Sequence, residues 1–348
     1  MVPGLSLIQV DGAQGEGGGQ IVRTALALAA VTGQAFELSR IRAGRPRAGL
    51  RPQHLAAVRA AALICAARVG GAFDGSPDLR FEPGPVASGE FHFEIGTAGA
   101  ATLVLQTVLG PLATAGGTSR VEVLGGTHVP ASPSFHYLAN HWAAVVARLG
   151  LLPRLSLTRA GFYPPGGGEV RAEVGAWPRP ASLSLEERGG LVSVRGTSGA
   201  GRLKGDVARR QRDAAQAWLW ERRRLEATWE VLEVEAASPG SFLLLEAVFE
   251  NGRAGFGLLG ERGLKAEVLG ERGARRLLKF LDGEGAVDAH LADQLAVPLA
   301  LARGGGRVAT PEVTTHLETV VSVLCRFGIP ARTWGRRGGP GGLEVGRC

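Results

Sequence analysis

Residues 21–70 hold the pattern that decides the fold: IVRTALALAAVTG (21–33), FELSRI (36–41) and RPQHLAAVRAAALICAARVG (51–70). The first and third segments have apolar residues at helical spacing, and the short segment between them is typical of a strand. The same succession returns in AATLVLQTVLGPLATAGG, SRVEVLGG and FHYLANHWAAVVARLG (100–150), and again in HLADQLAVPLALARGGG, RVATPEV and TTHLETVVSVLCRFG (290–328). We therefore predict an α/β fold of the α+β type in which one unit occurs three times.

The spacing of the three copies predicts an insertion in the third. The first two copies begin about 80 residues apart and the second and third about 190, which leaves roughly 110 additional residues. The proline-bearing GAWPRPAS (175–182) and the glycine-rich LDGEGA (281–286) have the composition of linkers. We predict a large domain of residues 1–181 and 283–348, and a smaller inserted α/β domain of residues 182–282.

The inserted segment contains elements of its own. Strands are predicted at LVSVRG (191–196), SFLLLEAVFENG (241–252) and AGFGLLG (254–260), and helices at VARRQRDAAQAWLWERRR (207–224) and RGARRLLKFLDG (272–283). The first of these helices is rich in arginine and carries Trp218 and Trp220. Such a face is either an RNA-binding surface or, as we expect, a solvated face whose tryptophans pack on the inserted sheet.

Composition narrows the class of protein. A chain of 348 residues, 45% of them apolar, is typical of about two folded domains. No stretch has the features of a membrane span or a signal peptide, and three scattered cysteines (65, 325 and 348) indicate neither a disulfide framework nor a zinc site. We expect a cytoplasmic protein without a membrane partner. The net charge of +7 suits a polyanion, although a GC-rich genome also favours arginine.

The segment DGAQGEGGGQIVR (11–23) surrounds Glu16 with five glycines just before the first apolar helix. Glycine lets backbone N–H groups approach a ligand closely, and a helix N-terminus attracts anions. The segment is not a P-loop, because the first lysine of the chain is Lys204, and Gln20 breaks the dinucleotide-binding spacing. It is either a phosphate-binding loop or a glycine-rich turn between a strand and a helix.

A histidine stands at the start of the last apolar helix. In TTHLETVV, Thr315 and Glu318 fit a T-x-x-E capping box, which would place His316 in the first helical turn. The positive end of a helix disfavours imidazolium and attracts phosphate, so His316 is a candidate nucleophile. The alternative is a polar residue at the rim of an amphipathic helix whose buried stripe is Val313, Leu317, Val320, Val321 and Leu324.

Two further groups of polar residues are candidates for ligand binding. Arg42, Arg45, Arg47 and Arg51 crowd the loop IRAGRPRAGLRPQH, where they either aim at phosphate oxygens or are solvated. In HLADQL, Asp293 and Gln294 lie among apolar residues, where an unpaired carboxylate is costly. They either pair locally or hold a ligand such as a ribose or a base.

Taken together, these segments resemble the RNA 3'-terminal phosphate cyclase family. The motifs DGAQGEGGGQIVR, IRAGR followed by GL and QH, GTAGAATLVLQTVL, GGTH, GFYPPGGGEV, LADQL and TTHLETVV stand in the family's order over essentially the whole chain. The resemblance implies a large domain of three βαβαββ units similar to the C-terminal domain of translation initiation factor three. It also implies a smaller domain inserted in the third unit.

The resemblance implies an activity as well: conversion of an RNA 3'-terminal phosphate to a 2',3'-cyclic phosphate, with ATP and a divalent metal (Mg or Mn). His316 would take AMP from ATP, the RNA 3'-phosphate would take the AMP from His316, and the 2'-hydroxyl would expel it. Glu16 matches the metal-associated position. The nucleotide and phosphate positions implied are Gln20, Arg23, Arg42, Arg45, Gln106, His290, Leu291, Ala292, Asp293 and Gln294.

The chain departs from the family pattern at two places. His290 stands where relatives have tyrosine, so imidazole would stack on adenine, and Val129 and His136 replace an asparagine and an aspartate. Two rival functions are a non-catalytic ribosome-assembly relative, which should lack the nucleophilic histidine, and an enolpyruvyl transferase, which lacks the inserted domain. ATP-dependent labelling of the protein separates the three. The sequence indicates neither the physiological RNA nor the oligomeric state.

Overall fold

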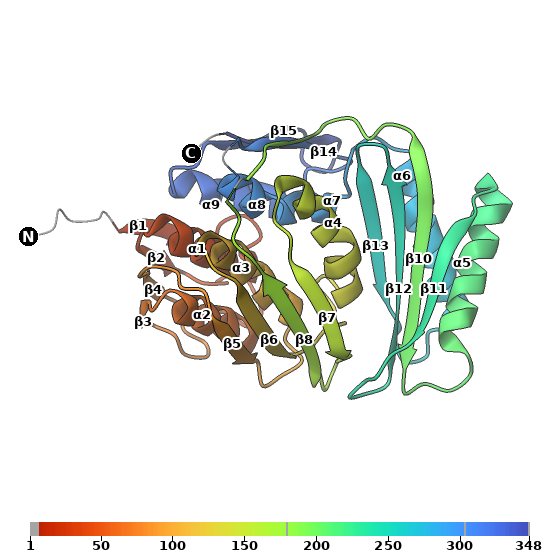
Figure 1. Ribbon diagram of the computed structural model, residues 1–348, viewed down its shortest axis with the longest axis horizontal. Coiled ribbons are helices and arrows are strands. Elements are labelled where there is room, and N and C mark those ends of the chain that lie inside the picture. The colour runs from red at the N-terminus through yellow and green to blue at the C-terminus, as the bar shows by residue number, and fades with distance from the viewer. Residues whose placement is uncertain (1–6, 179, 303, 347–348) are drawn as a thin grey trace, which may run out of the picture.

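The computed structural model describes residues 7–178, 180–302 and 304–346, which form a mixed α/β protein with four four-stranded sheets (Figure 1). In the first sheet, of order β1-β2-β4-β3, β1 (Ile8–Asp11) runs parallel to β2 (Phe36–Ser39). Strand β4 (Leu79–Glu82) runs antiparallel to both β2 and β3 (Arg68–Gly70). Helix α1 (Gly19–Thr32) connects β1 to β2, and α2 (Pro52–Ile64) connects β2 to β3.

Two further sheets have the same strand order and the same strand directions. The second contains β5 (Glu90–Glu94), β6 (Ser119–Gly125), β7 (Arg154–Arg159) and β8 (Gly168–Val174), with α3 (Ala101–Thr114) between β5 and β6. The third contains β9 (Leu183–Leu185), β14 (Gly306–Thr310), β15 (Ala331–Gly335) and β16 (Gly341–Val345), with α7 (Ala289–Gln294), α8 (Ala296–Leu301) and α9 (Thr315–Arg326). This recurrence agrees with the sequence periodicity.

Strand β9 changes the predicted boundary of the insertion. The sequence pattern puts residues 183–185 in the inserted domain, but Leu183 and Leu185 pair in parallel with Gly306 and Val308 of β14. The third sheet therefore receives its first strand before the insertion and its remaining strands after it. A three-residue strand has too few side chains to show an alternating pattern, which is why the sequence did not reveal it.

The second unit differs from the prediction in its second helix. The segment predicted as one helix over residues 135–150 is helical, but it divides into a π-helical turn η1 (Tyr137–Trp142), a short α4 (Ala143–Val146) and a 3₁₀ turn η2 (Ala147–Leu149). A π-helical turn widens the helix and is frequent at functional sites.

The inserted sheet has the order β11-β10-β12-β13 and one helix-covered face (Figure 1). Its elements are β10 (Leu191–Gly201), α5 (Val207–Arg223), β11 (Ala227–Glu233), β12 (Gly240–Phe249), β13 (Arg253–Leu259) and α6 (Ala266–Leu281). The predicted strands and helices of this segment are confirmed. Strand β11 was not predicted, since it is an edge strand with mostly exposed or half-buried residues.

The arginine-rich helix α5 only partly follows the expectation. Trp218 packs against the core of the inserted segment, and the guanidinium of Arg275 lies 4.3 Å from its ring centroid. Trp220, in contrast, is 46% exposed, so the prediction that it packs on the sheet is wrong. Arg210 and Arg223 form ion pairs with Glu267 and Asp282, as expected for a solvated face.

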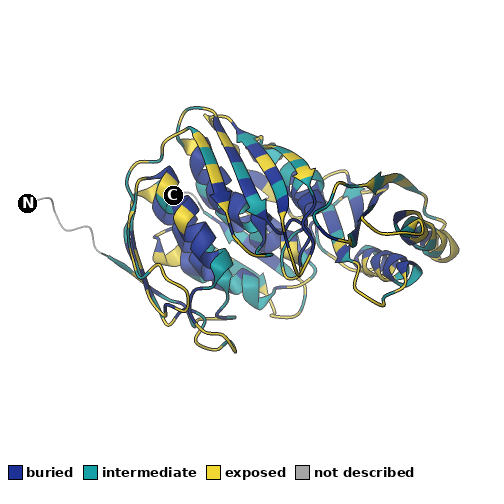
Figure 2. Cartoon of the chain, turned by 90° about the horizontal axis from the view of Figure 1, so that it is seen from below, coloured by how far each residue is buried: buried dark blue, intermediate teal, exposed yellow. Residues whose placement is uncertain are grey.

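Two apolar cores organise the molecule. One joins the helices of the first three sheets, and the other joins β10, β12, β13, α5 and α6. A small cluster of Ala160, Phe162 and Phe242 connects the two parts. Figure 2 shows buried residues on the helix faces that pack inward and alternating burial along the strands. No helix in the described ranges is long and apolar enough to cross a membrane.

Helix α1 is the central element of the larger core. Because Ile21, Val22, Leu26 and Leu28 are buried on different sides of it, α1 packs against α2, α3 and α9 at once. The N-terminus of α1 is thereby held beside the N-terminal turn of α9, where the candidate site lies.

Candidate active site

The glycine-rich loop between β1 and α1 packs directly on α9. Gly15 and Gly17 both have a φ of +59°, a conformation that favours glycine. A Cβ on Gly15 would lie 2.1 Å from Oγ1 of Thr319, so a side chain there would collide with α9. Gln14 also donates a 2.7 Å hydrogen bond to Ser322 of α9. These contacts therefore hold the loop that precedes α1 against α9.

The first turn of α1 is open to a ligand. Its N-cap is Gly18, which offers no side-chain cap, and a Cβ built on Gly18 would have only the ends of Arg45 and Glu16 within 4 Å. Uncapped N–H groups at a helix N-terminus form a site for anions. The first turn of α1 therefore has room for an anion.

His316 lies in the first turn of α9, but the capping residue differs from the prediction. Thr314, not Thr315, is the N-cap, and its hydroxyl accepts a 3.1 Å hydrogen bond from the N–H of Leu317. Glu318 pairs with Arg337 and takes no part in a capping box. The predicted buried stripe is confirmed: Val313, Leu317, Val320, Val321 and Leu324 are all buried.

The side chains of Gln20 from α1 and Glu16 from the glycine-rich loop both contact His316 of α9. Its Nδ1 lies 2.6 Å from Oε1 of Gln20, an acceptor, so Nδ1 donates this hydrogen bond. Its Nε2 faces Oε2 of Glu16, and Oε1 of Glu16 pairs with Arg45. The His316 side chain is 44% exposed, which leaves the ring open to a ligand.

The environment of His316 favours the neutral ring. Burial lowers its pKa below the usual value, the charge of Glu16 opposes this, and His290, Arg23 and Arg45 lower the pKa further. The N-terminal end of α9 acts in the same direction. Because Nδ1 is bound to Gln20, Nε2 is the ring nitrogen available for nucleophilic attack once Glu16 releases it.

Glu16 has one oxygen that suits a cation. Its Oε2 is buried and faces Nε2 of His316, and a carboxylate oxygen is a preferred ligand of Mg²⁺ and Mn²⁺. Among the described residues no three His, Cys, Asp or Glu side chains are grouped as a ready metal site. Glu16 therefore fits a metal held mainly by phosphate oxygens and water, the usual arrangement for Mg²⁺.

Helix α7 brings the LADQL residues to the same region. Gln294 accepts a 2.6 Å hydrogen bond from Gln106 of α3 and donates one of 2.9 Å to the carbonyl of His290. Burial and the nearby Asp288 raise the pKa of Asp293 to about 8, although Arg23 opposes the shift. Burial lowers the pKa of Arg23 to about 10, so it remains a cation at pH 7.

Two other predicted positions of this helix face inward. The side chains of Leu291 and Ala292 are fully buried in the large core. Ligand contact by these side chains is therefore excluded in this conformation, and only their backbone groups could take part. Asp293, at 9% exposure, lies at the boundary between core and site.

The arginine loop contributes unequally to the site. Arg45 reaches Glu16, whereas Arg42 donates hydrogen bonds of 2.6 and 3.3 Å to the carbonyls of Arg47 and Gly49 and so braces the loop itself. Arg51 lies 3.4 Å from Asp74. The structure thus brings Arg45 into direct contact with the His316 group and leaves Arg47 outside it.

His54 was part of a quoted motif but was not assigned a place in the site. It is buried, its Nδ1 accepts a 3.0 Å hydrogen bond from the N–H of Arg51, and its pKa falls to about 3 through burial and nearby arginines. A Cβ on Gly19 would lie 2.2 Å from Nε2 of His54. His54 is therefore a neutral ring against the first turn of α1, and its position after an arginine loop was the available signal.

The two departures near residues 129–136 are buried. Val129 and His136 are 5% and 7% exposed, and the His136 ring stacks on Phe242 of the inserted sheet at 4.2 Å. Burial lowers the pKa of His136 to about 4, so the ring is neutral at pH 7. Both side chains are therefore buried away from solvent, and His136 packs on the inserted sheet.

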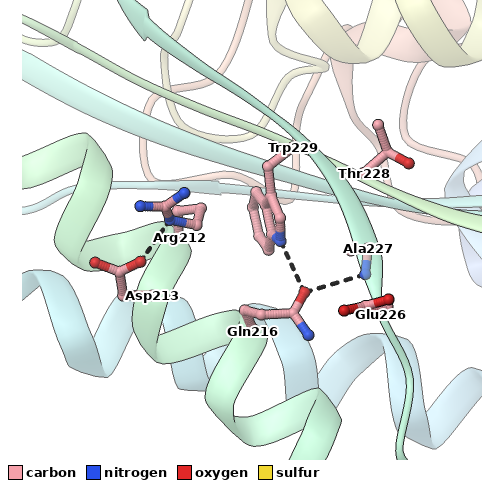
Figure 3. A pocket seen from close by; sticks show the side chains of 7 residues that line it. All are labelled: Arg212, Asp213, Gln216, Glu226, Ala227, Thr228 and Trp229. Carbon is pink, nitrogen blue, oxygen red and sulfur yellow. Dashed lines mark hydrogen bonds and ion pairs between the residues drawn. The ribbon is translucent and has the colours of Figure 1, made fainter.

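Surface hollows lie apart from this group of residues. One of about 550 Å³ is lined by α5 and β11, where Gln216 accepts hydrogen bonds from the N–H of Ala227 and the indole of Trp229 (Figure 3). No residue of the His316 group lines it. Cys348 lies outside the described residues.

Comparison with known proteins identifies the family. The family model described as RNA 3'-terminal phosphate cyclase matches residues 14–330. Similar proteins named RNA 3'-terminal phosphate cyclase come from Methylococcus capsulatus (44% identical; 93% of this chain and 92% of that one) and Ralstonia nicotianae (45%; 92% and 91%). A solved enolpyruvyl transferase, NikO from Streptomyces tendae, is similar at 15% identity and a TM-score of 0.27 over 49% of this chain and 33% of that one. The chain belongs to the RNA 3'-terminal phosphate cyclase family.

Proposed function

We propose that this protein converts the 3'-terminal phosphate of an RNA into a 2',3'-cyclic phosphodiester, with consumption of ATP, through a covalent His316–AMP intermediate. The observation that carries the proposal is the orientation of His316. Gln20 accepts a hydrogen bond from Nδ1, and Nε2 faces Glu16 in the loop that precedes the N-terminus of α1. His316 itself lies in the first turn of α9, and helix N-termini favour a phosphate nearby.

The first step is attack by Nε2 of His316 on the α-phosphorus of ATP. An N–P bond forms, the bond to the bridging oxygen breaks, and pyrophosphate leaves with the bonding electrons. Arg23, Arg45 and the free N–H groups of α1 stabilise the charge on the phosphates. The residual proton of the ring stays on Nδ1, where Gln20 accepts its hydrogen bond.

Two further displacements complete the reaction. An oxygen of the RNA 3'-phosphate attacks the histidine-bound AMP, which frees His316 and leaves the RNA end activated as an adenylate. The neighbouring 2'-hydroxyl then attacks the RNA phosphorus, loses its proton, and expels AMP. The last step is favoured because nucleophile and phosphorus are on one ribose.

We propose Glu16 as the protein ligand of Mg²⁺ or Mn²⁺, because its Oε2 is buried beside the proposed nucleophile. Such a metal supplies positive charge to the triphosphate. On the opposite side, Gln294, Gln106, Asp293 and the His290 ring would hold the nucleoside, with imidazole stacked on adenine.

We also propose that the first three sheets are copies of one βαβαββ unit similar to the C-terminal domain of initiation factor three. Their common strand order supports this. We propose two parts close to the predicted ones, a large part of residues 1–181 with 283–348 and an insertion of residues 182–282. Strand β9 stays with the large part, so the insertion begins after Leu185. The two apolar cores support the division.

The test of the function is covalent labelling with ATP carrying a labelled α-phosphate. The proposal predicts one adenylate on the peptide that contains His316, and its discharge by an RNA with a 3'-phosphate but not by one with a 3'-hydroxyl. A binding protein without catalysis would take up no covalent label.

A further inference from the structure

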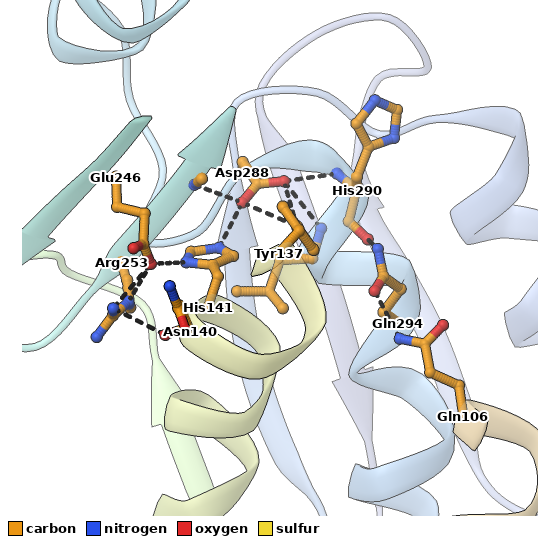
Figure 4. A network of polar contacts seen from close by, with 11 residues as sticks. Gln106, Tyr137, Asn140, His141, Glu246, Arg253, Asp288, His290 and Gln294 are labelled. Atoms are coloured by element: carbon orange, nitrogen blue, oxygen red, sulfur yellow. Dashed lines mark hydrogen bonds and ion pairs between the residues drawn. The ribbon is translucent and has the colours of Figure 1, made fainter. Parts of the chain in front are cut away.

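A buried polar network connects the inserted sheet to helix α7 (Figure 4). Its members, called the Asp288 network below, are Tyr137 and His141 of η1, Glu246 of β12, Arg253 of β13, and Asp288, the N-cap of α7. The proposed reaction uses none of these residues. Buried charges are costly unless paired, so a network of this kind requires an explanation.

Asp288 is the centre of the network and accepts hydrogen bonds from three parts of the chain. Its Oδ1 accepts from the N–H groups of His290 and Leu291 at 3.1 and 3.0 Å and from the hydroxyl of Tyr137 at 3.0 Å. Its Oδ2 accepts from the N–H of Gly255 in β13 at 3.1 Å and contacts Nε2 of His141 at 2.9 Å. One oxygen thus caps α7 while the other binds the inserted sheet.

His141 bridges the two carboxylates of the network. Nε2 contacts Asp288, and Nδ1 lies 3.4 Å from Oε1 of Glu246, which also accepts a 2.7 Å hydrogen bond from Arg253. Burial alone lowers the pKa of His141, but the hydrogen bonds and charges of Asp288 and Glu246 outweigh it and raise the pKa. The raised pKa favours the imidazolium form of His141, which with Arg253 would balance the two carboxylates.

The backbone of the inserted sheet is shaped to receive this histidine. A Cβ on Gly255 would lie 2.8 Å from the Cγ and Cδ2 atoms of His141, so any side chain there would displace the ring. Arg253 also donates a 2.9 Å hydrogen bond to the carbonyl of Asn140 in η1. The insertion therefore holds η1 and α7 through side chain and backbone together.

We propose that the Asp288 network is a positioning device through which the inserted sheet fixes the N-terminus of α7, and with it the nucleoside side of the ATP site. The inference rests on the proposed function, because α7 carries His290, Asp293 and Gln294. It assigns a role to the insertion: its β12 and β13 strands set the affinity of a site to which they contribute no contact with ATP.

The test uses Glu246→Gln, which keeps the shape of the side chain but removes the charge that faces His141. Glu246 touches neither α7 nor the proposed ligand positions. Asp288→Asn is the second variant, since its Oδ1 still caps α7 while an amide replaces the oxygen that binds Gly255 and His141. Ser198→Ala is the matched control, because Ser198 is equally buried in the inserted sheet but bonds only Ala208 and Gln211.

The first measurement needs no nucleotide. Hydrogen exchange in a peptide covering residues 286–296 should be faster in Glu246→Gln and Asp288→Asn than in the parent, and unchanged in Ser198→Ala. Equal protection in all four proteins would contradict the proposal. The same would follow if Ser198→Ala loosened this peptide as much as Glu246→Gln, because general weakening of the insertion would then explain the result.

The second measurement is ATP binding and single-turnover adenylylation against ATP concentration. We expect Glu246→Gln to raise the half-saturating ATP concentration about five-fold or more, while the rate at saturating ATP stays within about two-fold of the parent. Glu246→Asp, which keeps the charge, should restore part of the affinity. A fall in saturated rate with unchanged affinity would overturn the inference.

A third variant separates this inference from the proposed function. Gln294→Ala removes a side chain of α7 that is itself expected at the nucleoside. If Gln294→Ala leaves ATP binding unchanged, the proposed ATP site is wrong. If Gln294→Ala weakens ATP binding and the Asp288 network variants do not, the site stands and the positioning role of the network is refuted.

Discussion

Glu16 joins the arginine loop to the candidate nucleophile, because its Oε1 pairs with Arg45 and its Oε2 with Nε2 of His316. A cation at Oε2 would replace the contact with His316 and keep the imidazole unprotonated through charge repulsion. One carboxylate would then contribute both to ligand binding and to the state of the nucleophile.

Glu16→Gln tests this role of the carboxylate. The variant keeps side-chain size and should fold, but we expect the metal concentration that gives half-maximal adenylylation to rise at least about ten-fold, since a charged ligand is lost. Titration with MgCl₂ and MnCl₂ measures this, with Glu37→Gln on the exposed side of β2 as the control. An unchanged metal requirement would remove Glu16 from the metal site.

Asp293 allows a prediction about stability and pH. Its carboxyl has a pKa of about 8 in the folded protein against 3.8 in the unfolded chain, so the unfolded state loses the proton first and stability falls as pH rises between these values. Asp293→Asn has no such proton to lose. We expect the stability of the variant relative to the parent to rise by about 3–4 kcal/mol between pH 5 and pH 8.

Urea unfolding of parent and variant at pH 5, 6, 7 and 8 without nucleotide measures this difference. Subtracting the free energy of unfolding of the parent from that of the variant at each pH removes the contribution of the other titratable groups, which the two proteins share. A gain that is the same at every pH, or that shrinks as pH rises, would show that Asp293 is ionised in the ligand-free site.

At the scale of elements, the site depends on the contact between the glycine loop and α9. Gly15 and Gly17 have the same φ, but a Cβ on Gly15 meets Thr319 at 2.1 Å, whereas one on Gly17 has no atom closer than 3.5 Å. The two positions therefore separate the cost of backbone conformation from the cost of the contact.

Gly17→Ala should lower the free energy of unfolding by about 1 kcal/mol, the cost of a left-handed non-glycine residue. Gly15→Ala should cost more and also slow adenylylation, because the loop must leave α9 and take Glu16 with it. Adding Thr319→Ala should recover part of the loss. Denaturant unfolding and single-turnover labelling check the series, and equal effects of Gly15→Ala and Gly17→Ala would contradict the packing argument.

At the scale of the whole molecule, the insertion is expected to be removable only if β9 is kept. Arg188 donates hydrogen bonds of 3.0 Å to the carbonyls of Phe280 and Leu281, so the two ends of the insertion are close enough for a short linker. Deletion of residues 182–282 also removes β9 and leaves one side of β14 unpaired. Deletion of residues 188–282 leaves the third sheet whole.

The 188–282 deletion should therefore fold with a higher melting temperature than the 182–282 deletion, by about 2–4 °C for each kcal/mol of β9 pairing. It should melt below the full chain, because His141 and Asp288 lose their partners in β12 and β13. Circular dichroism on heating measures the order. Equal melting temperatures for the two deletions would place β9 outside the folded large part.

Periodicity in the sequence predicted the repeated units and the inserted elements, because long apolar runs record helix faces and strands directly. The expected capping box placed His316 in the first turn of α9. Sequence patterns failed where the deciding contact joins distant segments. Strand β9 is too short to show a pattern. Thr314 and Thr315 are both threonines, so the sequence did not show which of them caps α9. The Asp288 network joins residues more than 100 positions apart.

The central claim, that Nε2 of His316 forms a covalent bond to AMP, is tested most directly by labelling the parent and His316→Asn with ATP labelled at the α-phosphate. Asparagine keeps a polar side chain in the first turn of α9 but has no basic ring nitrogen. The readouts are label on the protein, its mass-spectrometric position, and cyclisation of a 3'-phosphorylated RNA.

We expect one adenylate on His316 in the parent, stable to alkali and labile to acid as a P–N bond is. His316→Asn should fold and bind ATP but take no label and cyclise no RNA. Cyclisation by His316→Asn at near the parent rate, or an adenylate mapped to any other residue, would rule out His316 as the nucleophile.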